Sequence, residues 1–205
     1  MPRTDQILTS LQSIVTEYSL FAIIWHALFY FLLVAFIFKW FPSNKVFAIL
    51  LCLPLISVSV FAWISGNPFN GSLFALAAIL LFIFGLKAPD QVVQTSQLIF
   101  LISGIILVSF GLIYPHFIKP DSALGYLYES PAGLIPCPTL SILIGLALIF
   151  NGFGSNSISL LLIILGLFYG SFGVLRLKVS IDLFLLAGTL IYVIKYLLSF
   201  RISAA

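Results

Sequence analysis

The stretch Gly133-Leu134-Ile135-Pro136-Cys137-Pro138-Thr139 opens an apolar run that continues to Phe150. Each of its two prolines removes a backbone N–H donor and disfavours helical geometry in the residue before it. Proline is tolerated in the first turn of a helix, where the N–H groups have no intrahelical partner. We therefore predict that a helix begins at Pro138, with Cys137 at or near its N-cap.

The composition on either side of this stretch is that of a membrane protein. Hydrophobic residues make up 62% of the chain and charged residues only 7%, with a mean hydropathy of +1.24. Soluble proteins need about a quarter of charged residues to cover their surface. The net charge of +3, without a basic cluster, argues against a nucleic-acid partner. Membrane lipids are the expected surroundings.

The apolar residues fall into runs of membrane-spanning length. Each run is near the ~17–25 residues that cross a bilayer as a helix, and short turns rich in Pro, Gly and Asn separate most of them. The fold class predicted is an all-α, polytopic transmembrane helical bundle, forming a single integral membrane domain over residues 19–205. The runs, about seven in number, cover residues 19–39, 46–65, 69–86, 98–114, 134–151, 157–175 and 183–200.

The first 18 residues differ from the rest because their apolar residues recur with a helical period. Ile7, Leu11 and Ile14 share one face with Leu8 and Val15, and polar side chains occupy the other. This pattern predicts a short amphipathic helix lying in the membrane interface. An extension of the first span is the alternative.

The orientation follows from the distribution of Lys and Arg between the loops. The two sides are nearly balanced, and Lys39 and Lys45 beside the first span favour an N-terminus outside and a C-terminus in the cytoplasm. Alternation of the spans places the Asn67-Pro68 turn, the connection 115–133, Cys137 and the turn 176–182 at one face of the membrane.

Cys137 is the candidate reactive group of that face. The positive end of a helix dipole favours a thiolate, which binds soft metals such as Cu(I) or attacks electrophiles. Thr139 could add an oxygen ligand, and His116 lies on the same side. The alternatives are a cysteine that only fits a helix start fixed by Pro136 and Pro138, and a solvated loop histidine.

Three further positions carry weaker indications. His26 lies inside the first span, where an ionisable side chain suggests a proton relay or contact with a polar substrate, unless it is a neutral imidazole bonded to a neighbouring helix. Asn67, before Pro68, is a candidate ligand or a helix cap. Asp182 is expected to cap the last span, with Arg176 or Lys178 as its ion-pair partner.

Two features of the spans are expected to be structural. Gly166 and Gly170 have the spacing that lets two helices touch backbone to backbone, inside the bundle or, as the alternative, at a homodimer seam. Pro54 predicts a kink in the second span.

The chain resembles the bacterial membrane protein family called domain of unknown function 6064. The resemblance rests on the 133–139 stretch before an apolar helix, Tyr114-Pro115, Asn67-Pro68, Gly170-Ser171 and Asp182, in that family's order. Ser19 and His26 stand where the family often has Asn and Pro. The resemblance implies a multi-span fold and directs attention to Cys137, and it implies no activity.

No phosphate-binding glycine loop, Ser/His/Asp set or Cys-x-x-Cys motif is present, so catalysis and cofactors are not predicted. The leading hypothesis is a transporter or binding protein for a small solute or a soft metal ion, with its site at the Cys137 face. The first alternative is a noncatalytic scaffold or assembly subunit, with a membrane-protein partner or a second copy of itself. The second is a membrane enzyme acting on lipid or quinone through Cys137 or His26.

Overall fold

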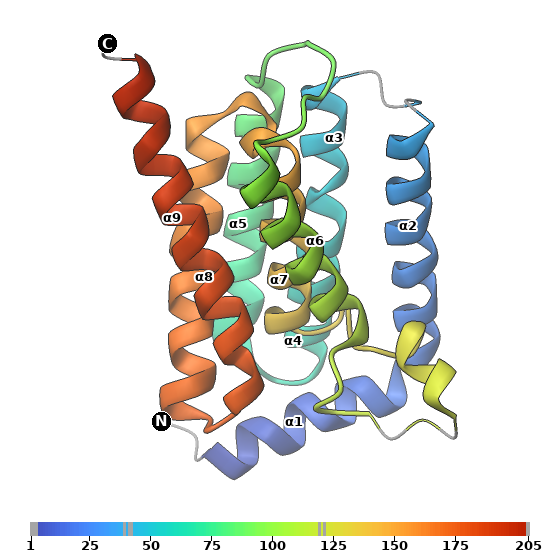
Figure 1. The fold of residues 1–205 in the computed structure, drawn as a ribbon. Coiled ribbons are helices and arrows are strands. Elements are labelled where there is room, and N and C mark those ends of the chain that lie inside the picture. Colours follow the sequence, from blue (N-terminus) through green and yellow to red (C-terminus); the bar gives the residue numbers. More distant parts are fainter. Residues whose placement is uncertain (1–3, 39, 41–42, 119, 121, 204–205) are drawn as a thin grey trace.

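The computed structural model describes residues 4–38, 40, 43–118, 120 and 122–203, and this part of the chain is a helical bundle without strands (Figure 1). The predicted all-α class is confirmed. Lys39, on which the predicted orientation partly rests, lies outside the described residues. The long helices are α1 (Thr4–Glu17), α2 (Ser19–Ile37), α3 (Asn44–Leu50), α4 (Cys52–Ile64), α5 (Pro68–Leu86), α6 (Leu98–Ile113), α7 (Pro136–Ile149), α8 (Asn156–Ser171) and α9 (Leu183–Ser203). Short helical turns are η1 (Ala123–Leu127), η2 (Asn151–Gly154), η3 (Phe172–Arg176) and η4 (Ser180–Asp182).

The predicted apolar runs coincide with helices to within a few residues, but the count of seven spans is loose. Within the described residues, four segments are long and apolar enough to cross a membrane, or five if the bent pair α1–α2 is one span. Helices α6 and α7, with 16 and 14 residues, are apolar but shorter. At ~1.5 Å per residue they reach roughly 24 and 21 Å, below the ~30 Å of a hydrocarbon core.

Helix α7 can be short because the other helices surround it. Every residue from Pro138 to Ile149 is buried, so α7 forms the centre of the bundle (Figure 1). Its closest neighbour is α6. A Cβ atom at Gly145 would lie 2.8 Å from the carbonyl oxygen of Gly104, so the two backbones are in contact here. The glycine pair at this seam allows the approach.

Proline and glycine act in the other helices as the sequence suggests. The second span is broken at Leu51, between α3 and α4, three residues before Pro54, which cannot donate to the carbonyl of Leu50. Gly166 lies against Thr189, and a Cβ atom at Gly170 would lie 3.0 Å from the Cα atom of Leu186. Both glycines therefore pack α8 on α9 inside the bundle.

Helix α1 lies across one end of the bundle, bent by 75° from α2 (Figure 1). Its buried residues are Leu11, Ile14 and Val15, which pack with Leu134 and Ile135 of the segment before α7. The α4–α5 turn, the loop from Pro115 to Gly133 and the α8–α9 turn lie at the same end. The connections predicted to share one face of the membrane therefore lie at one end of the bundle.

Candidate functional site

Helix α7 begins at Pro136 and not at Pro138, so the predicted helix start is wrong by two residues. Ile135 is the N-cap, with extended dihedral angles (φ −127°, ψ 159°), and both prolines occupy the first turn. This costs no hydrogen bond because the first N–H groups of a helix lack intrahelical acceptors. Cys137 is consequently the second residue of α7, on the side of the turn that faces the α8–α9 connection.

The thiol of Cys137 lies against the carboxylate of Asp182. Its Sγ atom donates a hydrogen bond to Oδ2 of Asp182 at 3.3 Å, and the hydroxyl of Tyr114 donates to Oδ1 at 2.7 Å. Asp182 is only 1% exposed, whereas Cys137 remains partly exposed. These three residues, from α7, η4 and the end of α6, form the candidate site, which we call the Cys137–Asp182–Tyr114 cluster.

The cluster contains a thiol and not the thiolate expected from the helix dipole. A sulfur that donates to a carboxylate must hold its proton, and a negative oxygen at this distance opposes a second negative charge. The Tyr114 phenol donates to the same carboxylate, so it also holds its proton. Both oxygens of the buried carboxylate are thus bonded to uncharged groups.

Asp182 does not act as the cap expected from the sequence. Its side chain points into the bundle from η4, because Ser180–Asp182 forms a short 3-10 turn before α9 starts at Leu183. Neither Arg176 nor Lys178 is its partner, since uncharged donors occupy both of its oxygens. The expectation of an ion pair with these cations is therefore wrong.

Gly173 makes room for the Asp182 carboxylate. It belongs to the π-helical turn η3, in which the N–H of Leu177 bonds the carbonyl of Phe172 at 3.1 Å. A Cβ atom at Gly173 would overlap Oδ2 of Asp182 and lie 2.7 Å from its Cγ atom. Only a glycine leaves the carboxylate in contact with Cys137.

A second group of polar side chains lies beside the cluster, at the α4–α5 turn. The hydroxyl of Tyr169 donates to Oδ1 of Asn70 at 2.9 Å, and the Tyr169 phenol is within electrostatic range of Cys137. Asn67 is the N-cap of α5, where its side chain accepts from the N–H of Asn70 at 3.1 Å, and Pro68 is the first helical residue. Asn67 thus serves as a cap.

Thr139 fixes the loop that leads into α7. Its buried hydroxyl accepts from the N–H of Gly133 at 2.8 Å and donates to the carbonyl of Ile135 at 2.7 Å. Gly133 has a φ of +77°, and the ring of Trp25 occupies the space where its side chain would be. Thr139 is close to Cys137 in sequence, but both hydrogen bonds of its hydroxyl go to the backbone of the loop before α7 and not to the cluster.

We expect Thr139→Val to lower the free energy of unfolding by about 1–3 kcal/mol, because it strands the buried N–H of Gly133. Thermal unfolding of the purified protein in detergent measures this loss. Thr189→Val is the matched control, because the buried Thr189 hydroxyl bonds only the carbonyl of Leu185 in its own helix. If Thr139→Val lowers the free energy of unfolding by no more than the control does, the Thr139–Gly133 hydrogen bond does not hold the loop.

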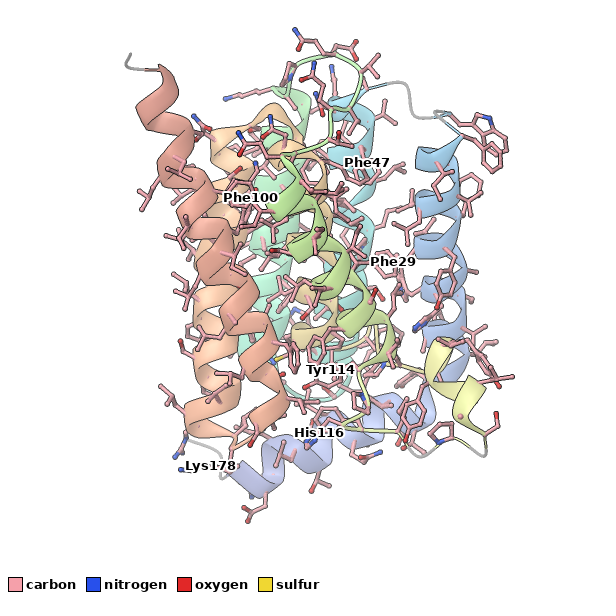
Figure 2. The ribbon with its side chains drawn as sticks, in the orientation of Figure 1. Phe29, Phe47, Phe100, Tyr114, His116 and Lys178 are labelled. Atoms are coloured by element: carbon pink, nitrogen blue, oxygen red, sulfur yellow. The ribbon has the colours of Figure 1, made fainter. Side chains whose placement is uncertain are left out.

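The two histidines lie apart from Cys137. His26 is buried between α2 and α6, with Nδ1 2.8 Å from the carbonyl oxygen of Ala22 and Nε2 2.9 Å from that of Leu112. Its ring therefore lies within hydrogen-bond distance of a carbonyl oxygen on each of the two helices. His116 is exposed at the bottom of the bundle, below Tyr114 (Figure 2), and its ring meets Phe117 edge-on at 4.5 Å.

The arrangement gives no support to a soft-metal site. In the described part of the chain, no group of three or more His, Cys, Asp or Glu side chains could hold a metal ion. Cys137 is paired with a carboxylate, which is a hard ligand that Cu(I) does not favour.

No family model, no curated protein and no solved structure matches this chain.

Proposed function

We propose that this protein is a small membrane transporter or solute-binding protein whose functional group is the Asp182 carboxylate, held by Tyr114 and Cys137. The observation that carries the proposal is a carboxylate, 1% exposed, that is bonded only to uncharged donors inside an apolar bundle. An ionisable group in such surroundings is costly and is usually retained for a function. A proton, or the cationic end of a small polar solute, would compensate the negative charge of the Asp182 carboxylate.

The position of the cluster also favours transport. Its members come from the end of α6, the start of α7 and the α8–α9 connection, so a movement between these helices would change the surroundings of the carboxylate. We propose a bacterial inner membrane as the location, with the N-terminus outside.

The test is solute uptake by liposomes that contain the purified protein and a pH-sensitive dye. A panel of primary amines, amino acids, sugars and monovalent cations is offered to the wild type and to Asp182→Asn. We expect at least one compound to be taken up, with a rate at least about tenfold lower in Asp182→Asn, which corresponds to about 1.4 kcal/mol. Asp90→Asn is the control, because Asp90 is an exposed carboxylate in the loop after α5.

Equal uptake by the wild type and Asp182→Asn would remove the proposed role of the carboxylate. An absence of uptake for every compound in the panel would favour the noncatalytic scaffold instead. The resemblance to the domain of unknown function 6064 family adds no activity, and membership of that family stays a prediction.

A further inference from the structure

A narrow void lies between α1 and the bundle, next to the start of α7. Its polar lining comes from Ser10 of α1, Ser65 after α4, and Asn67 and Asn70 at the start of α5, and Pro136 closes its inner side. The void has a volume of about 10 Å³, which is about the space that one water molecule needs. Its polar groups can give that water the partners it requires.

The void connects two regions of different exposure. Ser10 and Ser65 also line a shallow, open hollow on the outer side, together with Asp5, Thr9 and Ser13 of α1. On the inner side, Asn70 accepts the hydrogen bond of Tyr169, and Pro136 immediately precedes the partly exposed Cys137. The void therefore reaches from the open hollow to Pro136, the residue before Cys137, and Cys137 itself packs against the apolar cores on both sides of α7.

Helix α1 is the element that narrows this route. It packs on the bundle through one apolar face, in which Leu11, Ile14 and Val15 are buried and Ile7 and Leu8 lie beside them. Hydrogen bonds to two loops add to this packing: Gln12 Nε2 donates to the carbonyl of Phe117 at 2.8 Å, and Thr4 Oγ1 donates to the carbonyl of Arg176 at 3.4 Å. An element packed on one face only opens at lower free energy than the core.

The far end of α1 is better held. Its connection to α2 passes through Tyr18, whose ring lies 4.7 Å from that of Phe61, and Phe21 contacts the same ring at 5.2 Å. A helix fixed at this end and packed on one face only can swing away from the bundle about the 75° bend.

We infer that the void lined by Ser10, Ser65, Asn67 and Asn70 is the aqueous entrance to the Cys137–Asp182–Tyr114 cluster, and that α1 is its gate. The ligands admitted are water, protons and small polar solutes. The inference deepens the proposed function, since it supplies the access that a carboxylate buried under α1 needs. Its test requires no solute, so the two proposals can fail separately.

The experiment measures how fast Cys137 reacts with a small, positively charged methanethiosulfonate in liposomes. The background is Cys52→Ala, which leaves Cys137 as the single thiol. Leu11→Ala removes part of the buried face of α1 and is expected to raise the rate at least about tenfold. Leu20→Ala, the same change at a side chain that is 65% exposed on α2, is expected to leave the rate within about twofold.

The labelling rate of the other cysteine, Cys52, serves as the control for general unfolding. Cys52 is buried in α4, and in a Cys137→Ala background its rate should not change when Leu11→Ala is added. Gln12→Ala, which removes only the bond to Phe117, should also raise the rate at Cys137, by a smaller factor. The gate is refuted if Leu11→Ala and Gln12→Ala leave the rate at Cys137 unchanged, or if Leu11→Ala accelerates Cys52 to the same extent.

Discussion

Gly145→Leu is expected to prevent α6 from packing on α7 and to destabilise the protein by more than about 3 kcal/mol. The physical reason is that two of the three nearest neighbours of Gly145 are backbone atoms, which cannot rotate away. A Cβ atom there would lie 2.8 Å from both the Gly104 carbonyl oxygen and the Val108 nitrogen, and 2.7 Å from Cγ2 of Val108. Since α7 is the buried centre of the bundle, separation of this pair affects every other helix.

The yield of monodisperse protein and its thermal unfolding in detergent measure this effect. Ala187→Leu is the matched control. Ala187 lies on the exposed face of α9, so lipid can accommodate the larger side chain there. If Gly145→Leu had the same yield and stability as the wild type, α6 and α7 would not meet in the way described.

The helices were predictable from the sequence because apolar run length carries that information directly. The run predicted at 69–86 and helix α5 (Pro68–Leu86) differ by one residue, because Asn67 and Pro68 are strong helix-start residues. The short α7 also follows from its run, but its burial on all sides does not. A buried central helix and a lipid-facing one have the same apolar composition, so composition alone does not tell how many of these helices cross a bilayer.

One part of the candidate site could be predicted, namely Cys137 and the face at which it lies. The break at Pro136 and Pro138 drew attention to Cys137, and the topology placed the α8–α9 turn at the same face. Nothing in the sequence pairs Cys137 with Asp182, which is 45 residues away, because a carboxylate at a helix start is more often a cap. Its inward direction depends on η3 and η4, and such irregular turns leave no periodic pattern.

Tyr114 and Gly173 were missed for different reasons. A tyrosine at the end of an apolar run fits an aromatic belt, so its hydroxyl was not assigned a buried partner. Gly173 follows Gly166 and Gly170 at helical spacing, and this pattern favours a packing role. The space it provides for Asp182 depends on three-dimensional proximity across the turn.

Gly173→Ala is expected to displace the Asp182 carboxylate from Cys137, and so to abolish uptake while costing about 2–3 kcal/mol of stability. The added methyl group would overlap Oδ2 of Asp182, which leaves a buried charge without its thiol donor. Gly85→Ala is the control for adding a methyl group to a buried helical glycine, since its nearest contact is 3.3 Å from a flexible side-chain atom of Ile49.

A double-mutant cycle separates this effect from a general packing defect. If the collision is with the carboxylate, Gly173→Ala should cost at least about 1 kcal/mol less in an Asp182→Ala background than in the wild type. Some cost remains, because the Cβ atom of residue 182 would still lie 2.9 Å from the new methyl group. Equal costs in the two backgrounds would show that Gly173 is required by the π-helical turn and not by Asp182. The close contact between carboxylate and thiol would then be a by-product of the turn, and the case for a functional site at Cys137 would lose its geometric basis.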